Sequence, residues 1–248
     1  MIKYIGKDTE SLSFLKDICD ICAVRIMALA ECYGGYDDII SVWVQYDGGD
    51  KPVGAVSKYG GDMTVWISQE GDIPELRDFL SFTGGSSVLS NERLYDAQER
   101  AVVMKREGNM QEEAFSYKEE ELASAYELIK KCSGKGFEAP DYGDFMLDIS
   151  HRLRRGRAVF ALGYEGENPA SFAMTTAMTE KYSVIGAVCT HPDMRRKGLG
   201  RKCVTELLKK CGRRDMLLLR EEGKNREFYL SLGFRDHSEA FAMIRRKE

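Results

Sequence analysis

The sequence lacks any apolar run long enough to cross a membrane, and no signal-peptide pattern is present near its start. It also lacks the broad positive charge that is typical of nucleic-acid-binding proteins, because its formal net charge is −4 at pH 7. Its seven cysteines are odd in number and show no disulfide-framework spacing, as in proteins of a reducing compartment. We therefore expect a cytoplasmic protein with no membrane segment and no nucleic-acid partner.

Motifs for metal or redox chemistry are also scarce. The pair Cys19-x-x-Cys22 lies in an apolar, helix-like stretch together with Ile18, Ile21 and Ile26. This setting favours buried packing over reactive or metal-binding thiols. We assign no metal to the chain.

The 248 residues, 43% of them hydrophobic, are enough for one large domain or two small ones. Residues 46–52 resemble residues 164–169 as hairpin turns, and residues 101–106 resemble residues 241–246 as final strands that end in basic residues. These similarities predict a duplicated fold. We expect one domain over residues 1–110 and a second over residues 114–248, separated by a polar, acidic stretch.

Hydrophobic periodicity predicts helices and strands in both halves. In the first half, we expect helices over 12–32 and 74–82, and strands over 39–45, 53–58, 63–67 and 101–105. In the second, we expect helices over 119–132, 142–154 and 199–211, and strands over 157–164, 171–178, 184–190 and 216–219. This order predicts an α/β fold with a mixed central sheet flanked by helices.

The most informative motif is a basic, glycine-containing turn between an apolar strand and an amphipathic helix. Its residues are Arg195, Arg196, Lys197, Gly198, Leu199 and Gly200. Glycine lets backbone amides approach a ligand, and the first amides of a helix have no partner within it, so phosphate oxygens suit them. Cations beside a helix start are unfavourable by roughly 0.3–1 kcal/mol each unless an anion offsets them. The alternative is a solvated basic turn.

The segments on either side of the turn add to this pattern. Residues 184–190 are predicted to form a strand buried on both faces, with Gly186 marking a bulge or a close approach by another backbone. Further along, Asn225 is expected to cap a short helix that carries Phe228 and Tyr229. A tyrosine hydroxyl, with a pKa near 10, can protonate a departing thiolate. The alternative is that Tyr229 only packs.

Together, the turn, its preceding strand and the aromatic helix resemble the Gcn5-related N-acetyltransferase (GNAT) superfamily. Its pattern Arg/Gln-x-x-Gly-x-Gly/Ala is matched by Arg195, Gly198 and Gly200, and the resemblance covers roughly residues 115–248. A Walker loop does not fit, because no Gly-Lys is followed by Ser or Thr. A dinucleotide fingerprint does not fit either, because Cys203 stands in place of its third glycine.

The resemblance implies a GNAT fold and the co-substrate acetyl-CoA or another acyl-CoA. It places the pyrophosphate on the amides of the turn, the pantetheine arm along the preceding strand, and a proton donor to the thiolate at Tyr229. The implied coenzyme-binding residues are Ala187, Val188, Cys189, Thr190, Arg195, Arg196, Lys197, Gly198, Leu199, Gly200, Arg201, Asn225, Phe228 and Tyr229.

The first half lacks a comparable turn. At the corresponding position, residues 67–72, Glu70 and Asp72 would repel a pyrophosphate. The chain is therefore interpreted as two tandem GNAT-like halves, of which the first is degenerate. Residues 141–190 resemble a subgroup related to glycine N-acyltransferases, which implies a small amine or amino-acid acceptor.

Acceptor residues are less well defined. Acidic Glu138, Asp141 and Asp144 could hold a cationic amine or accept its proton, although acids in loops are usually just solvated. His151 is followed by three arginines that could recognise a carboxylate, or that simply suit a helix end. The three arginines are Arg152, Arg154 and Arg155. No general base is assigned.

We expect the amine to attack the thioester directly, with Tyr229 protonating the thiolate. A covalent route through Cys189 is the alternative, but no base is visible beside it in the sequence. Two interpretations of the first half remain: a lid and homodimer scaffold that shapes the acceptor pocket, which we prefer, or a partner-binding surface of a non-catalytic acyl-CoA-binding regulator.

Overall fold

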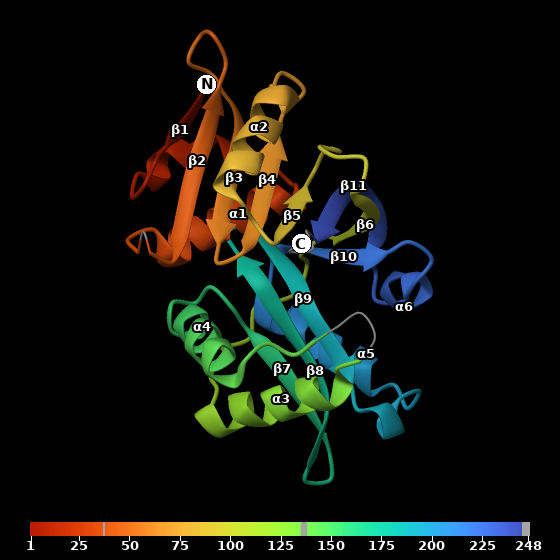
Figure 1. Ribbon diagram of the computed structural model, residues 1–248. Coiled ribbons are helices and arrows are strands. Elements are labelled where there is room, and N and C mark those ends of the chain that lie inside the picture. Colours follow the sequence, from red (N-terminus) through yellow and green to blue (C-terminus); the bar gives the residue numbers. More distant parts are fainter. Residues whose placement is uncertain (37, 135–137, 245–248) are drawn as a thin grey trace. The chain divides into compact units, whose positions relative to one another are not determined.

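The computed structural model describes residues 1–36, 38–134 and 138–244 (Figure 1). Its contacts divide the chain into two compact units. Unit 1 combines Met1–Lys105 with Leu217–Arg226 and Arg235–Glu248, and unit 2 combines Arg106–Met216 with Glu227–Phe234. Within the described residues, no helix is both long enough and apolar enough to cross a membrane.

Unit 1 is built on a mixed sheet in the strand order β1-β2-β3-β4-β5-β11-β6-β10. Strands β1 to β4 pair antiparallel, β4 and β5 pair parallel, and β11 pairs antiparallel with both β5 and β6. The last strand of the chain therefore completes the sheet of unit 1. The strands are β1 Ile2–Tyr4, β2 Ile40–Tyr46, β3 Pro52–Tyr59, β4 Asp62–Ile67, β5 Ser87–Ser90, β6 Glu99–Arg106, β10 Asp215–Glu221 and β11 Arg235–Ile244.

The helices of unit 1 are η1 (Thr9–Leu15), α1 (Ile21–Tyr33) and α2 (Ile73–Thr83). The prediction of one helix over residues 12–32 is wrong, because η1 ends at Leu15 and α1 begins only at Ile21. The carboxylate of Asp20 accepts hydrogen bonds from the amides of Cys22 at 2.8 Å and Ala23 at 3.1 Å, which makes Asp20 the N-cap of α1.

The turn between β4 and α2 corresponds in the first half to the basic turn of the second half, and no anion site was expected there. The carboxylate of Asp72 caps α2 by accepting from the amide of Glu75 at 2.9 Å, and Glu70 forms an ion pair with Lys51. A carboxylate of the chain itself thus occupies this helix start.

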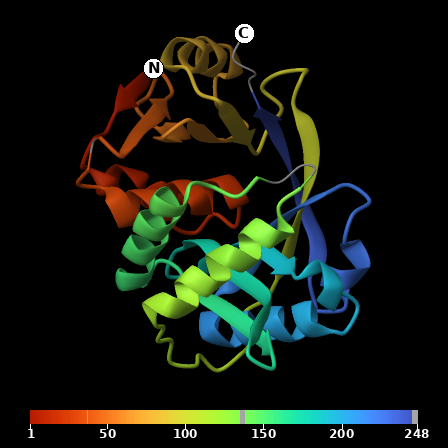
Figure 2. The same ribbon diagram turned by 60° about the horizontal axis from the view of Figure 1, so that its bottom comes forward.

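Unit 2 contains an antiparallel sheet of β7 (Phe160–Glu165), β8 (Asn168–Met178) and β9 (Tyr182–Thr190), with β8 in the middle. Its helices are α3 (Glu119–Cys132), α4 (Tyr142–Arg154), η2 (Pro192–Met194) and α5 (Leu199–Cys211), with most of the short α6 (Arg226–Leu230). In Figure 2, α3 lies across the strands of this unit.

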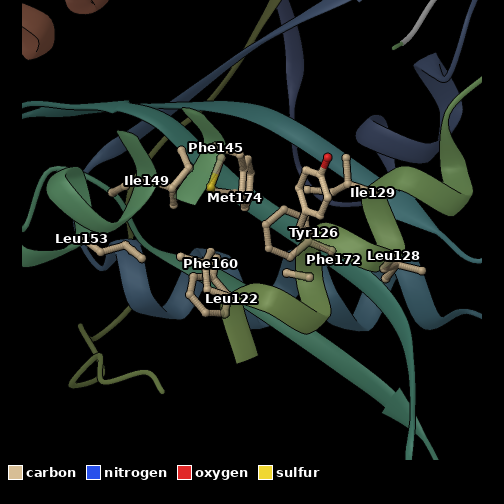
Figure 3. Close-up of a cluster of buried hydrophobic side chains, with 12 residues drawn as sticks. Leu122, Tyr126, Leu128, Ile129, Phe145, Ile149, Leu153, Phe160, Phe172 and Met174 are labelled. Carbon is tan, nitrogen blue, oxygen red and sulfur yellow. The ribbon is translucent and has the colours of Figure 1, made fainter. Parts of the chain in front are cut away.

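The two faces of β8 contact different helices because successive strand residues point to opposite faces. Phe172 and Met174 pack into an apolar core with side chains of α3 and α4 (Figure 3). On the opposite face of β8, the hydroxyl of Ser171 donates to the carbonyl oxygen of Leu199 at the start of α5. The expected mixed α/β fold with flanking helices is confirmed, whereas the duplicated arrangement stays a prediction.

Candidate functional site

The basic turn leads from β9 through η2 to the start of α5. Arg196 and Gly198 both have left-handed backbone conformations, with φ values of +62° and +79°. Gly198 is the N-cap, and its carbonyl oxygen accepts the first helical hydrogen bond from Lys202 at 3.1 Å. The helix therefore begins at Leu199, as predicted, and the side chains before it are exposed.

The first backbone amides of α5 are free of internal acceptors. Among the residues that the structure describes, none accepts a hydrogen bond from the amides of Leu199, Gly200 or Arg201. Unpaired amides at the positive end of a 13-residue helix form a suitable site for an anion.

Three cationic side chains of this region are held by neighbouring groups in unit 2. Arg195 donates to the carbonyl oxygen of Thr190 at 3.2 Å, and Lys197 lies 3.2 Å from a carboxylate oxygen of Glu165. Arg201 donates to the carbonyl oxygen of Ser231 at 3.1 Å, which connects the start of α5 to the segment after α6. Arg195 and Arg201 are thus anchored on backbone carbonyl groups, whereas the charge of Lys197 is paired with that of Glu165.

Strand β9 differs from its predicted burial. Val184 and Ile185 are buried, Gly186 is exposed, and residues 187–190 are half-buried, so the prediction of burial on both faces is wrong for the second half of the strand. The predicted irregularity at Gly186 is present, because the register with β8 shifts there. The close approach comes from a side chain, Thr176, and not from another backbone.

The second half of β9 contacts helices on both of its faces. Ala187 and Cys189 pack against the apolar core of α3 and α4. Thr190 lies beside α5, with its hydroxyl oxygen 2.9 Å from where a Cβ would stand at Gly200. This half-buried segment thus leads directly to the basic turn.

The thiol of Cys189 is a poor nucleophile in this setting. Burial raises its pKa well above the ordinary value near 9, and the neighbouring thiol of Cys132 raises it further. Cys132, at the end of α3, in turn donates to the carbonyl oxygen of Thr190 at 3.4 Å. Cys189 therefore remains protonated at neutral pH, which argues against the covalent route.

The aromatic helix α6 lies beside the start of α5. A Cβ at Gly200 would lie 4.0 Å from Cζ of Phe228, and the rings of Phe228 and Tyr229 have centroids 5.0 Å apart. Tyr229 is half-buried, and burial raises the pKa of its hydroxyl above 10. Gly233 ends this segment with φ +88°, as expected of a helix stop.

Asn225 directly precedes α6, but it does not have the usual geometry of an N-cap. Its φ is +57°, in the left-handed region, whereas N-cap residues normally have extended backbone. The contacts group Asn225 with unit 1. Its contact with a coenzyme stays a prediction.

The acidic acceptor candidates have different surroundings. Asp141 caps α4, because its carboxylate accepts from the amides of Gly143 at 2.7 Å and Asp144 at 3.2 Å. Glu138 and Asp144 are exposed. Residues 135–137, which directly precede Glu138, lie outside the described residues. The structural role of Asp141 was missed by the sequence analysis, although an Asp before a helical pattern is a recognisable cap signal.

The basic candidates at the end of α4 are only partly available. Arg152 donates to Asp148 and to the carbonyl oxygen of Thr176, both at 2.7 Å, so its guanidinium holds α4 to β8. Arg154 and Arg155 are exposed, and His151 lies in the last turn of the helix. This arrangement matches the alternative of a basic helix end. In the described part of the chain, no cluster of His, Cys, Asp or Glu is suited to a metal ion.

Comparison with known proteins supports the GNAT resemblance. Residues 122–234 match the model of the Acetyltransferase (GNAT) family, which supports acyltransferase activity in general. A GNAT acetyltransferase structure from Colwellia psychrerythraea is 11% identical over the whole of both chains, with a TM-score of 0.56. A GCN5-related N-acetyltransferase from Sphaerobacter thermophilus is 12% identical over 84% of this chain and 82% of that one, with a TM-score of 0.56.

A tandem GNAT protein from the clavulanic acid biosynthesis pathway is 10% identical over 100% of this chain and 99% of that one, also with a TM-score of 0.56. No curated protein sequence matches the chain. At these identities the similarities show the fold, and the chain has the fold of GNAT acetyltransferases.

Proposed function

We propose that the chain is an N-acyltransferase that transfers an acetyl group from acetyl-CoA to the primary amine of a small molecule or amino acid. The observation that carries this proposal is the turn after β9, where unpaired amides at the start of α5 lie among Arg195, Arg196 and Lys197. The turn lies inside the segment that matches the acetyltransferase family.

In the proposed complex, the pyrophosphate binds the amides of Leu199, Gly200 and Arg201. Arg196 and Lys197 are exposed beside these amides and supply positive charge. The pantetheine arm runs along residues 187–190, and the partial exposure of these residues supports this placement. Phe228 lies beside the start of α5, with its Cζ 4.0 Å from where a Cβ would stand at Gly200, and borders the same site.

The proposed reaction is direct attack of the neutral amine on the thioester carbonyl carbon. A C–N bond forms, the C–S bond breaks, and the sulfur leaves as a thiolate that takes a proton from the hydroxyl of Tyr229. The raised pKa of Tyr229 keeps that proton in place at neutral pH. Backbone groups of residues 187–190 polarise the thioester carbonyl, and Cys189 takes no covalent part.

We also propose that residues 1–110 form a degenerate GNAT-like domain and residues 114–248 the acyl-CoA-binding domain. Asp72 supports this division, because it caps α2 with a carboxylate where the second half presents free amides. In this proposal the first domain serves as a lid and homodimer scaffold in a cytoplasmic enzyme. An acceptor related to those of glycine N-acyltransferases remains part of the proposal.

Calorimetric titration with acetyl-CoA and CoA tests the coenzyme site, using the wild type, Gly198→Glu and the matched control Gly198→Ala. Both variants impose the same backbone strain at φ +79°, and no atom lies within 4 Å of the added Cβ. Only Glu adds a negative charge beside the turn. The proposal expects the glutamate variant to lose binding and the alanine variant to retain most of it. Wild-type protein that binds neither compound would refute the proposal.

Turnover distinguishes the enzyme from a non-catalytic acyl-CoA-binding regulator. Release of CoA thiol is followed with acetyl-CoA and a library of small amines and amino acids. An amine that accelerates thiol release, with the acetylated product identified by mass spectrometry, supports the enzyme. Tight acetyl-CoA binding without turnover across the library favours the regulator.

A further inference from the structure

The bulge in β9 lies opposite an irregularity in β8. In the register, Met174 pairs with Ala187 and Thr175 with Ile185, which passes over Gly186. A Cβ at Gly186 would stand 1.9 Å from Cγ2 and 2.7 Å from Cβ of Thr176. Because even the Cβ of Thr176 is this close, a change of its χ1 rotamer does not clear the space. Thr176 therefore fills the volume that a side chain at position 186 would need.

This inference rests on the proposed function, in which the coenzyme arm runs from the turn back along β9. The arm passes residues 190 to 187, and the next residue is Gly186, which is exposed. Beyond it, Ile185 and Val184 are buried, so the accessible part of the strand ends at the bulge. An acyl group at the end of the arm therefore lies beside Gly186 and Thr176.

We propose that Thr176 is a specificity-determining residue that restricts the donor to short acyl chains such as acetyl. The side chain stands where additional methylenes of a longer acyl group would extend. Its strand is also held in place, because Arg152 of α4 donates to the carbonyl oxygen of Thr176 at 2.7 Å and to Asp148 at 2.7 Å. Thr176 therefore does not withdraw easily from a longer chain.

The volume of Thr176, and not its hydroxyl, carries this role. The hydroxyl oxygen is buried, and no described residue forms a hydrogen bond with it. Thr176→Val keeps the shape and removes the hydroxyl, so it serves as the matched control. Thr176→Gly and Thr176→Ala remove the volume.

The test compares the dissociation constants of acetyl-CoA and hexanoyl-CoA by calorimetry, which requires no knowledge of the acceptor. In Thr176→Gly, and more weakly in Thr176→Ala, binding of hexanoyl-CoA relative to acetyl-CoA should improve by about tenfold or more. In Thr176→Val the ratio should match the wild type. An unchanged ratio in both the glycine and alanine variants, or an equal change in the valine variant, would overturn the inference. Wild-type protein that binds neither compound would instead refute the proposed function.

A second measurement tests the geometry without any coenzyme. Gly186→Ala forces a Cβ against Thr176 and should lower the melting temperature. Adding Thr176→Gly should restore much of the loss, whereas adding Thr176→Val should not. A Gly186→Ala variant with the wild-type melting temperature would overturn the steric basis of the inference.

Discussion

The hydroxyl oxygen of Thr190 stands 2.9 Å from the position that a Cβ would take at Gly200. Thr190 is the last residue of β9 and Gly200 lies in the first turn of α5, so the end of the strand and the start of the helix meet without room for a side chain. The glycine thus allows the unpaired amides to lie close to the strand along which we place the coenzyme arm.

Replacing Gly200 with alanine should weaken acetyl-CoA binding by about tenfold. The added methyl group pushes the first turn of α5 away from Thr190 and shifts the amides that we propose to bind pyrophosphate. Alanine favours a helix over glycine by about 1 kcal/mol, so the variant should remain folded. The measurement is the dissociation constant of acetyl-CoA by calorimetry, with circular dichroism to confirm the fold.

Thr190→Ala provides the control for this substitution. Combined with Gly200→Ala, it removes the hydroxyl that the new methyl group meets, and it should recover most of the lost affinity. If the single Gly200→Ala variant binds acetyl-CoA as tightly as the wild type does, the close contact has no role in positioning the amides.

Local sequence signals were sufficient for several elements of the fold. The predicted helices over 119–132, 142–154 and 199–211 have the bounds of α3, α4 and α5. Each combines a periodic apolar face with signals at its ends, such as the Glu-rich first turn of α3 and Gly212 after α5. The start of α5 was predictable for the same reason, whereas anion binding at the turn before it stays a prediction.

Contacts between distant parts of the chain were not predictable. Phe241 of β11 pairs with Ser90 of β5, and no local pattern specifies this pairing. The side chain of Thr176 beside Gly186 likewise depends on two coupled irregularities in neighbouring strands. The break before α1 was missed because apolar residues on both sides of Asp20 continue a helical pattern.

Replacing Cys189 with alanine should leave turnover within about threefold of the wild type, because a buried thiol with a raised pKa supplies little thiolate at neutral pH. A small cavity in the core is the expected consequence, measurable as a lower melting temperature. Turnover is measured by thiol release with the best acceptor amine.

Cys132→Ala is the matched control, because the thiol of Cys132 packs against the same core but donates a hydrogen bond to the carbonyl oxygen of Thr190. Intact-mass spectra of the wild type with acetyl-CoA should show no acetylated protein. Loss of turnover confined to Cys189→Ala, together with an acetyl adduct on the wild type, would establish the covalent route instead.

Asp20 should lower the stability of the protein at neutral pH even though it caps α1. Burial raises the pKa of its carboxyl, and the hydrogen bonds from the amides of Ala23 and Cys22 oppose this rise only in part. The folded state therefore favours the protonated form of Asp20. The contribution of this protonated carboxyl to the free energy of unfolding is complete below the ordinary pKa of 3.8, and it is lost as the pH rises through the pKa of Asp20 in the folded protein. Asp20→Asn, which keeps a capping oxygen without charge, should therefore be more stable than the wild type at pH 7.

Urea denaturation checks this expectation, with Asp20→Ala as the control that removes the cap as well as the charge. The alanine variant should be less stable than the asparagine variant by about 1 kcal/mol at all pH values. The advantage of Asp20→Asn over the wild type should disappear toward pH 3. An asparagine variant less stable than the wild type at pH 7 would show that the ionised carboxylate is net stabilising.

Replacing Tyr229 with phenylalanine should lower turnover by about 100-fold or more while leaving the dissociation constant of acetyl-CoA nearly unchanged. The ring packing against Phe228 and Phe234 is retained, so the variant removes the proton donor and little else. Because burial raises the pKa of this hydroxyl above its ordinary value, the wild type should keep the proton of Tyr229 at neutral and mildly alkaline pH. The ratio of the wild-type turnover number to that of the variant should therefore be constant from pH 6 to pH 9. Turnover numbers measured over this pH range test the expectation. Equal turnover in the two proteins would remove Tyr229 from the mechanism, and a difference that grows only at low pH would assign the proton to another group.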